Sequence, residues 1–189
     1  MTDTFTITAR NQIKRGSKKA DYRKEAVYQL IDRLKTGHVA FVENNEPRSL
    51  PLTIWRIDDD LYCHSANKGR FSNALISGQL LCVSFAINNQ WVMSKSAYHH
   101  SANYESAVLF CTGERLSAEE DFHRVFKAVI NQIEPDRWDQ IRPPSAKEMK
   151  ATTLIKLTIQ SASFKSRTGG PNEEPEDMEI PVWHGVLDA

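Results

Sequence analysis

The fold of this chain is decided around one polar stretch, Ser94-Lys95-Ser96-Ala97-Tyr98-His99-His100-Ser101-Ala102-Asn103-Tyr104-Glu105-Ser106. It contains two adjacent histidines, four serines, two tyrosines, an asparagine and a lysine. Apolar runs typical of strands lie on both sides, at residues 80–87 and 107–110. A buried polar group without a partner costs a few kcal/mol, so such a stretch indicates either a capped surface loop or the wall of a polar pocket.

Length and charge limit the classes of function that the chain can have. At 189 residues it is long enough for one domain with a substantial core. The 24 basic and 24 acidic residues give a formal net charge of zero, which argues against a general nucleic-acid-binding protein. No apolar run is long enough for a transmembrane helix, and the first residues lack a signal-peptide pattern. We therefore expect a cytoplasmic protein with no membrane partner.

The metal-ligating residue types do not form a metal site by their spacing. Cys63, Cys82 and Cys111 are far apart, odd in number and set in apolar runs, so buried thiols are expected. His99 and His100 are adjacent, and adjacent strand residues point to opposite faces. No carboxylate cluster or cysteine pair stands near them at a ligand spacing. We expect no metal ion, while haem ligation by one histidine stays open.

Hydrophobic periodicity predicts short antiparallel strands joined by tight turns, with a few helices. A helix is expected over residues 21–36, with Gly37 as its stop. Pro51 indicates a sheet edge or bulge. Two strands, 80–87 and 91–96, are expected on either side of a turn. The other expected strands are 38–42, 48–57, 61–65, 106–115 and 153–159, and the other expected helices are 71–77, 118–134 and 145–150.

These elements predict a mainly β fold with peripheral helices, a six- or seven-stranded antiparallel β-barrel. Residues 1–20 are polar and include a basic cluster, so we expect a flexible arm there. Residues 21–170 are expected to form the barrel domain. Residues 171–189 are acidic and are expected to pack on the domain as a tail, with Val182 and Trp183 as a candidate anchor.

A small phosphate site is indicated by the sequence His64-Ser65-Ala66-Asn67-Lys68-Gly69-Arg70. Here the end of a strand brings a hydroxyl and two cations to the start of a short helix. Helix N-termini attract anions, and an arginine adds a bidentate grip. An exposed basic turn that caps the helix is the alternative. Walker and dinucleotide-binding glycine motifs do not occur, and neither does the G-x-S-x-G motif of serine hydrolases.

In combination these motifs resemble the FMN-binding split-barrel proteins related to pyridoxamine 5'-phosphate oxidase, in particular the branch that includes nitroimidazole-resistance proteins. The resemblance covers about residues 20–187. Its most specific part is the His-His-Ser-x-Asn-Tyr-x-Ser pattern that begins at His99. The other matching pieces are residues 37–42, 51–53, 60–70, 137–144 and 181–185.

The resemblance implies a split-barrel homodimer that binds FMN at the subunit interface. It implies that Lys68 and Arg70 hold the phosphate with help from Ser65, while residues 51–53 and the later strands approach the ring. Similar proteins often carry arginine at the position of Glu105, so further phosphate contacts are not carried over. The cofactor-binding candidates are Pro51, Leu52, Thr53, His64, Ser65, Lys68, Arg70, Ser94, Lys95, Asn103, Tyr104 and Ser106.

The function that the resemblance implies is that of a flavin-dependent oxidoreductase acting on a small molecule, with NADH or NADPH as candidate donor. His99 and His100 are the candidate catalytic residues, as proton donor or substrate contact, because histidine titrates near neutral pH. One alternative is a flavin carrier or sensor without turnover. Another is a haem-binding split-barrel protein. Fold-level kinship does not fix the substrate.

Overall fold

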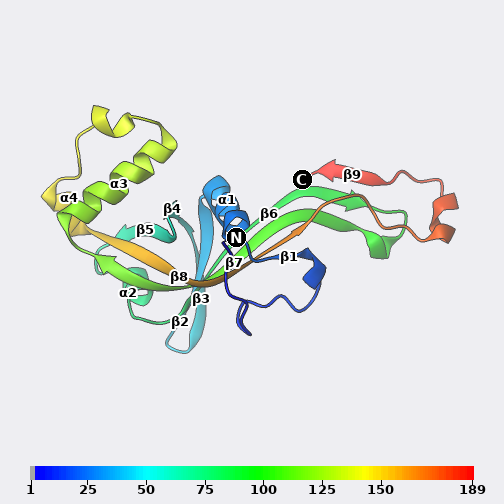
Figure 1. Ribbon diagram of the computed structural model, residues 1–189, viewed down its shortest axis with the longest axis horizontal. Helices are drawn as coiled ribbons and strands as arrows, with labels where there is room; N and C mark the ends of the chain where they lie inside the picture. The colour runs from blue at the N-terminus through cyan, green and yellow to red at the C-terminus, as the bar shows by residue number, and fades with distance from the viewer. Residues whose placement is uncertain (1–2) are drawn as a thin grey trace.

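A computed structural model describes the chain from residue 3 to residue 189. The elements in chain order are η1 Ser17–Lys19, β1 Ala20–Asp21, α1 Lys24–Leu34, β2 Thr36–Glu43, β3 Glu46–Thr53, β4 Trp55–Ile57, β5 Asp60–Ala66, α2 Arg70–Leu75, β6 Leu81–Met93, η2 Ala97–His99, β7 Ser101–Leu116, α3 Glu119–Ile133, η3 Arg137–Gln140, α4 Ala146–Ala151, β8 Thr152–Arg167, η4 Pro175–Glu179 and β9 Gly185–Asp188. The molecule is elongated, with α3 and α4 at one end and the β6–β7 hairpin with the C-terminal tail at the other (Figure 1).

The strands form one antiparallel sheet with the order β3-β2-β6-β7-β8-β5-β4, to which β1 adds beside β8 and β9 beside β6. The seven strands of the main path agree with the predicted six or seven, and the mainly β split-barrel class with peripheral helices is confirmed. Strand β3 ends this path, so the prediction that Pro51 lies at a sheet edge is also confirmed.

Three strands are much longer than the sequence analysis expected. The two strands predicted around a turn at residues 88–90 are wrong, because β6 runs on from Leu81 to Met93. Its register against β7 shifts between Asn88 and Gln90, so a β-bulge replaces the turn. Strand β7 begins at Ser101, inside the polar stretch, and β8 continues to Arg167. Polar strand residues were misread as loop because both faces of this part of the sheet lie outside the barrel core.

The barrel core is filled from facing strands, and α1 closes one side of it. Phe85, Leu109 and Ile155 are fully buried, as are Val27 and Ile31 of α1. Helix α1 does not end at Gly37 as predicted. Lys35 takes the left-handed conformation (φ 57°) that closes the helix. Gly37 lies in β2, where a Cβ would come within 2.7 Å of the Phe85 ring.

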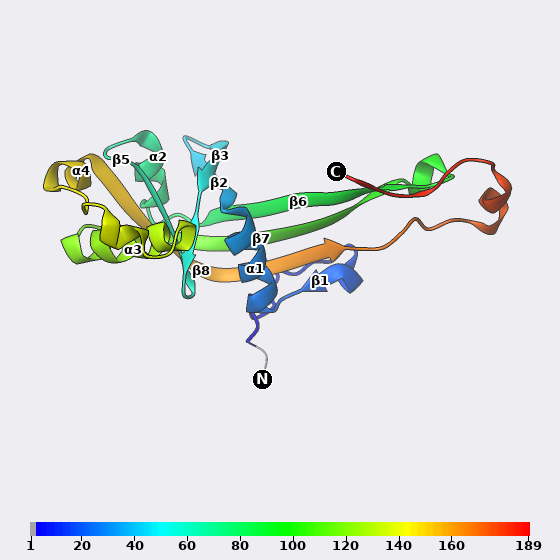
Figure 2. The same ribbon diagram turned by 90° about the horizontal axis from the view of Figure 1, so that it is seen from above.

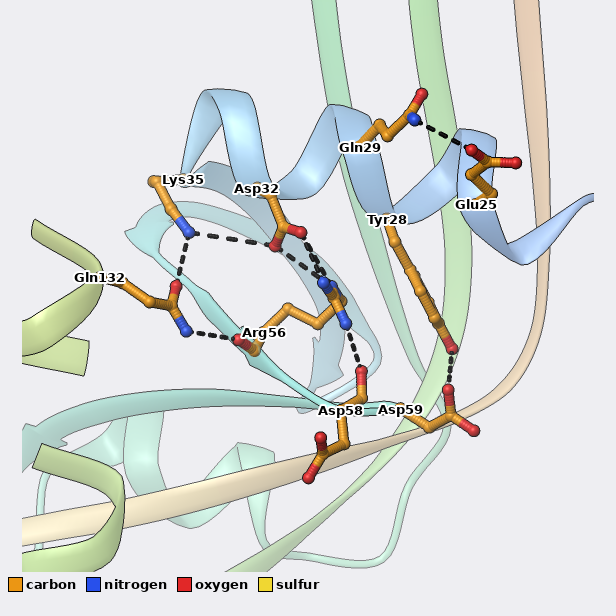
Figure 3. A network of polar contacts seen from close by, with 9 residues as sticks. All are labelled: Glu25, Tyr28, Gln29, Asp32, Lys35, Arg56, Asp58, Asp59 and Gln132. Carbon is orange, nitrogen blue, oxygen red and sulfur yellow. Dashed lines mark hydrogen bonds and ion pairs between the residues drawn. The ribbon is translucent and has the colours of Figure 1, made fainter. Parts of the chain in front are cut away.

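A polar network fixes α1 against β4 and α3 (Figure 3). The Arg56 guanidinium donates from Nε (3.1 Å) and Nη2 (2.6 Å) to the Asp32 carboxylate. The Lys35 Nζ donates to Gln132 Oε1 at 2.7 Å, and Gln132 Nε2 donates to the Arg56 carbonyl at 2.9 Å. Burial, with the nearby Arg56 charge, lowers the pKa of Lys35 despite the opposing effect of Asp32. Helix α1, strand β4 and helix α3 are therefore joined through Arg56, Lys35 and Gln132.

Segments at both ends of the chain lie on the sheet. In the N-terminal segment Phe5 and Asn11 are buried, and the Asn11 amide donates to the Ala162 carbonyl of β8 at 2.9 Å. Phe5 and Asn11 therefore contact the barrel, whereas most other side chains between residues 3 and 20 are exposed. In the tail, Val182 and Trp183 are more than half exposed and do not serve as the expected anchor. Strand β9 instead pairs with residues 90–93 of β6.

The three thiols lie in buried or partly buried positions. Cys63 and Cys111 are buried as expected, and Cys82 is partly buried. Burial raises the pKa of the Cys63 thiol to about 12. Between residues 3 and 189 no His, Cys, Asp and Glu side chains group in the numbers that a metal ion needs. In the same range no helix has the length and apolar character needed to span a membrane.

Replacing Gly113 with alanine is expected to destabilise the barrel where α2 meets β7. A Cβ on Gly113 would lie 2.0 Å from the Leu75 carbonyl oxygen, a backbone atom that cannot turn aside. We expect the free energy of unfolding in urea to fall by about 3 kcal/mol, the upper range for overpacking.

The matched control is Gly170→Ala, because nothing lies within 4 Å of a Cβ at Gly170. That variant should unfold like the parent protein. A Gly113→Ala protein as stable as the parent would show that α2 does not pack this tightly on β7.

Candidate functional site

Two arginines from different elements converge on one carboxylate at the barrel. Arg48 of β3 and Arg70 at the start of α2 place their Nε atoms 3.7 Å and 3.3 Å from the same oxygen of Glu43. The Glu43 side chain is 16% exposed, whereas that of Arg70 is 77% exposed. The Arg48 Nε is buried and has no hydrogen-bond partner among the described residues. This orphaned donor fits an anion that approaches from the Arg70 side.

The arginine pair is balanced by acidic neighbours. Arg48 also donates from Nη2 to Glu46 at 2.5 Å, and the Glu46 side chain is exposed. An exposed ion pair of this kind contributes only about 0–1 kcal/mol, so an anion could compete with Glu46 for Arg48 at little cost, whereas the Glu43 carboxylate is mostly shielded from solvent. Lys68, two residues before Arg70, adds a third cation at the surface.

The turn between β5 and α2 is held rigidly, so that its cations face outward. Asn67 donates from its backbone to the Ala151 carbonyl (2.8 Å) and from its side chain to the Lys150 carbonyl (2.8 Å). Its side-chain oxygen accepts from Arg115 at 3.1 Å. Lys68 follows in the left-handed conformation (φ 60°), which turns the chain into α2. Asn67, which the sequence analysis left without a role, fixes this turn.

The predicted residues on β3 and β5 lie on the barrel at this end. Pro51 and Thr53 are exposed on the edge strand β3, and Leu52 packs against the core. Ser65 is partly exposed near the end of β5. His64 is also exposed, and its ring lies 5.9 Å from the Phe126 ring of α3. Strand alternation therefore turns His64 toward the helical layer and Ser65 to the other face.

The polar stretch lies at the far end of the β6–β7 arm, where the tail of the same chain satisfies it (Figure 2). Ser94 Oγ donates to Glu173 Oε2 at 2.8 Å, and the Lys95 backbone N–H donates to Glu173 Oε1 at 3.1 Å. Lys95 Nζ donates to the Met178 and Ile180 carbonyls at 2.9 and 2.6 Å. We call this set of contacts around Glu173 the tail clasp.

Asn103 and Ser106 are likewise engaged within the chain. The buried Asn103 donates to Gln90 Oε1 at 3.1 Å, and its own oxygen accepts from Arg167 at 2.5 Å. Ser106 Oγ donates to the Lys165 carbonyl at 3.3 Å. These two side chains connect β6, β7 and β8.

The remaining residues of the stretch are more open. Tyr104 is partly exposed. His99 is partly exposed, with its Nε2 3.4 Å from Glu174, and the exposed His100 lies 2.9 Å from the Ser96 carbonyl through Nδ1. Both catalytic candidates thus sit at the arm tip with local partners.

Glu105, which stands where similar proteins often carry arginine, holds α1 to the arm. Its carboxylate pairs with Arg33 of α1 and accepts from Asn89 at 3.1 Å. Burial raises the pKa of Glu105, but the hydrogen bonds from Arg33 and Asn89 outweigh burial and leave it below its usual value. The negative charge is therefore neutralised inside the chain.

The two groups of candidate residues do not meet within one chain. The arginine pair and its turn belong to the barrel, whereas Ser94, Lys95, His99 and His100 belong to the connection between β6 and β7 at the tip of the arm (Figure 1). The sequence analysis assigned no role to Arg48, which begins an expected strand, or to Glu173, which lies in the expected tail. Their partners are remote in sequence, so no local pattern marks them.

Replacing Glu173 with alanine is expected to release the tail. The Glu173 side chain is only 8% exposed, and it also accepts from His184 Nδ1 at 2.9 Å. Without it, three donors lose their acceptor, so backbone amides of β9 should exchange hydrogen faster, as measured by mass spectrometry. The exposed Glu176→Ala variant of the same tail is the control and should exchange like the parent.

The tail clasp should also depend on acid pH. Burial raises the pKa of Glu173, but the hydrogen bonds from Ser94, His184 and Lys95 outweigh it and hold that pKa below its usual value. Stability from a lowered carboxyl pKa is present at neutral pH and is lost as pH falls through the lowered pKa. Unchanged exchange in Glu173→Ala at neutral pH would show that β9 holds the tail alone.

Comparison with known proteins gives consistent matches. A family model described as pyridoxamine 5'-phosphate oxidase matches residues 23–166. The flavocytochrome Anf3 from Azotobacter vinelandii is 32% identical with a TM-score of 0.89, over 96% of this chain and 85% of that chain. The FAD and heme binding protein from Mycobacterium smegmatis is 28% identical with a TM-score of 0.84, over 90% and 84%.

A third solved structure shares the fold alone. It is a putative 5-nitroimidazole antibiotic resistance protein from Bacteroides thetaiotaomicron, 16% identical with a TM-score of 0.65, over 77% of this chain and 85% of that chain. The resemblance to proteins related to pyridoxamine 5'-phosphate oxidase stated from the sequence is confirmed by the family match and the first relative. No curated protein matches the chain.

Proposed function

The chain belongs to the pyridoxamine 5'-phosphate oxidase family, and from this premise we propose that it binds a flavin nucleotide and serves as an oxidoreductase for a small molecule. The observation that carries the proposal is the convergence of Arg48 and Arg70 on Glu43. Two guanidinium groups, one with an orphaned buried N–H, match the oxygens of a phosphate group.

The edge strand beside the arginine pair suits the rest of a flavin. Within the described residues β3 pairs only with β2, so its outer backbone groups are open along Pro51 and Thr53. A flat ring with a hydrogen-bonding edge can lie along such a strand. A bound flavin supplies redox chemistry that side chains lack. The chain's part is to hold the phosphate and orient the ring.

We propose further that two copies of the chain share the site. The arginine pair lies on β3 and α2 of the barrel, whereas η2 with His99 lies at the tip of the β6–β7 arm (Figure 1), so we infer that His99 reaches a flavin at the arginine pair only from a second copy, and that Tyr104 of the arm does the same. The exposed Trp91, Tyr98 and Trp183 of the arm give a second copy apolar surface to cover. The proposed assembly is therefore a homodimer with the flavin at the interface between its two subunits.

The double variant Arg48→Gln, Arg70→Gln should bind flavin about 100-fold more weakly than the parent. A hydrogen bond to a charged group contributes about 1.5–3 kcal/mol, so each arginine accounts for roughly a tenfold change or more. The measurement is a fluorescence titration with FMN and, separately, FAD. Both are needed because the sequence indicated FMN, whereas the relative from Mycobacterium smegmatis is described as binding FAD.

Arg23→Gln is the matched control, since Arg23 pairs with Asp21 at the start of α1. It should bind flavin like the parent. Equal affinity in the double variant would refute the phosphate site, and a flavin-saturated species with the mass of one chain in sedimentation would refute the shared site. Anaerobic reduction of bound flavin by NADH or NADPH supports an oxidoreductase, and its failure with both favours a carrier or sensor.

Haem binding is the second candidate, because the two relatives with the highest identity among those described above are named a flavocytochrome and an FAD and heme binding protein. His64 is the histidine best placed for it. Its exposed ring borders a hollow of about 40 Å³ between α3 and β4–β5, whose wall includes Trp55, Tyr62 and Phe126. An imidazole beside aromatic rings suits haem, a flat and largely apolar macrocycle. A haem is larger than this hollow, so it would lie at the mouth of the hollow.

The absorbance spectrum after addition of haemin tests this candidate. A His-ligated haem should give a sharp Soret band in the parent protein, and His64→Ala should lose it. The control His38→Ala removes a histidine of β2 and should keep the band. A Soret band that survives in His64→Ala would exclude His64 as the ligand, and no band in the parent would exclude haem.

A further inference from the structure

The helical end of the molecule contains a cavity that is larger than the hollow beside His64. This cavity is not part of the arginine pair. It has a volume of about 360 Å³ and lies between α3, η3 and α4. This is within the range of about 300–1,000 Å³ found for small-molecule sites. An apolar cavity of about 150 Å³ is already large enough to bind benzene. The size therefore suits a ligand of more than one ring.

The wall of this cavity is aromatic on the side of α3. The rings of Phe122 and Phe126 are nearly parallel, with centroids 6.0 Å apart and planes 17° apart. Trp138 of η3 and Ile130 of α3 complete this part of the wall. Parallel rings favour offset stacking with a further flat ring. The cavity wall thus favours a flat ligand over a branched aliphatic one.

One cation stands at the cavity wall. Arg142 donates from Nη1 and Nη2 to the Glu148 carboxylate at 2.8 and 2.7 Å, and from Nη1 to the Pro143 carbonyl at 3.2 Å. A guanidinium carries five N–H groups, and these contacts use only Nη1 and Nη2. The Arg142 side chain is 70% exposed. Its unused N–H groups can therefore donate to an anion at the cavity mouth, while Glu148 holds the guanidinium in place.

Glu148 keeps two hydrogen bonds at its Oε2 without Arg142, whereas Arg142 is the donor to its Oε1. Its carboxylate accepts from the Ser145 backbone N–H at 2.8 Å and from the Ser145 hydroxyl at 2.9 Å, as the capping box of α4. A carboxylate at a helix N-terminus is also stabilised by the helix dipole. A ligand anion can share or take Arg142 without leaving a bare buried charge behind.

We propose that this cavity binds a flat aromatic carboxylic acid, with its rings between Phe126 and Trp138 and its carboxylate on Arg142. The site is separate from the proposed flavin site, since it is built from α3, η3 and α4 and shares no residue with the arginine pair. The ligand enters as the anion, so a neutral molecule of the same shape loses the contact with Arg142.

Isothermal titration with 2-naphthoate and its neutral counterpart 2-naphthamide tests the proposal on the full chain. The parent should bind 2-naphthoate saturably. Arg142→Gln should bind it at least tenfold more weakly while binding 2-naphthamide like the parent, which also shows that the cavity remains folded. Ile130→Trp should fill the cavity and abolish binding of both. Arg137→Gln removes a neighbouring arginine of η3 that does not line the cavity and should leave both affinities unchanged.

Three results would overturn the proposal. The first is that the parent binds neither compound. The second is that Arg142→Gln keeps the parent's affinity for 2-naphthoate, or loses affinity for both compounds equally. The third is that haemin, but not 2-naphthoate, binds in a manner that depends on Arg142, which would assign the cavity to a haem instead. Loss of flavin affinity plays no part in any of these outcomes, so the flavin proposal is tested independently.

Discussion

The continuous pairing of β7 with β6 on one side and β8 on the other is the constraint on which the rest of the structure depends. The ladder with β8 runs from Tyr104 to Leu116. A strand of 16 residues, the length of β7, extends about 54 Å at 3.4 Å per residue. That is too long for the wall of a small barrel. One part of the ladder therefore encloses the core with Leu109 and Ile155, while the other projects as an arm whose polar side chains must find partners elsewhere.

This division explains why the candidate residues fall into two groups. The barrel half presents cations on β3 and α2, where Glu43 keeps two guanidinium groups close together. The arm half uses the same kinds of polar side chain for structure. Ser94, Lys95 and Asn103 each have a partner in their own chain. The hydrogen-bonding side chains of this stretch therefore mainly stabilise the arm itself. Only side chains that remain open, such as Tyr104, are left to contact a ligand.

The sequence was sufficient for the fold class because apolar alternation is local, as in the run from Leu81 to Phe85. It was insufficient where contacts between residues that are distant in sequence decide the local structure. The run Asn88-Asn89-Gln90 has turn composition, yet pairing with Asn103 and Tyr104 makes it a bulge. Arg48 stands 22 residues before Arg70 in the sequence, and only the hairpin register with Glu43 brings the two together. Among the acidic tail residues, only packing distinguishes the partly buried Glu173 from the exposed Glu174 and Glu176.

The position of β9 has a consequence for the solubility of the arm. β2 covers β6 at residues 82–84, but residues 90–93 of β6 pair with β9. Without β9, that edge of the arm would be an unpaired strand that carries the large apolar side chain of Trp91. Open edges of this kind recruit strands from other molecules. Strand β9 therefore closes an edge on which strands of other molecules would otherwise pair.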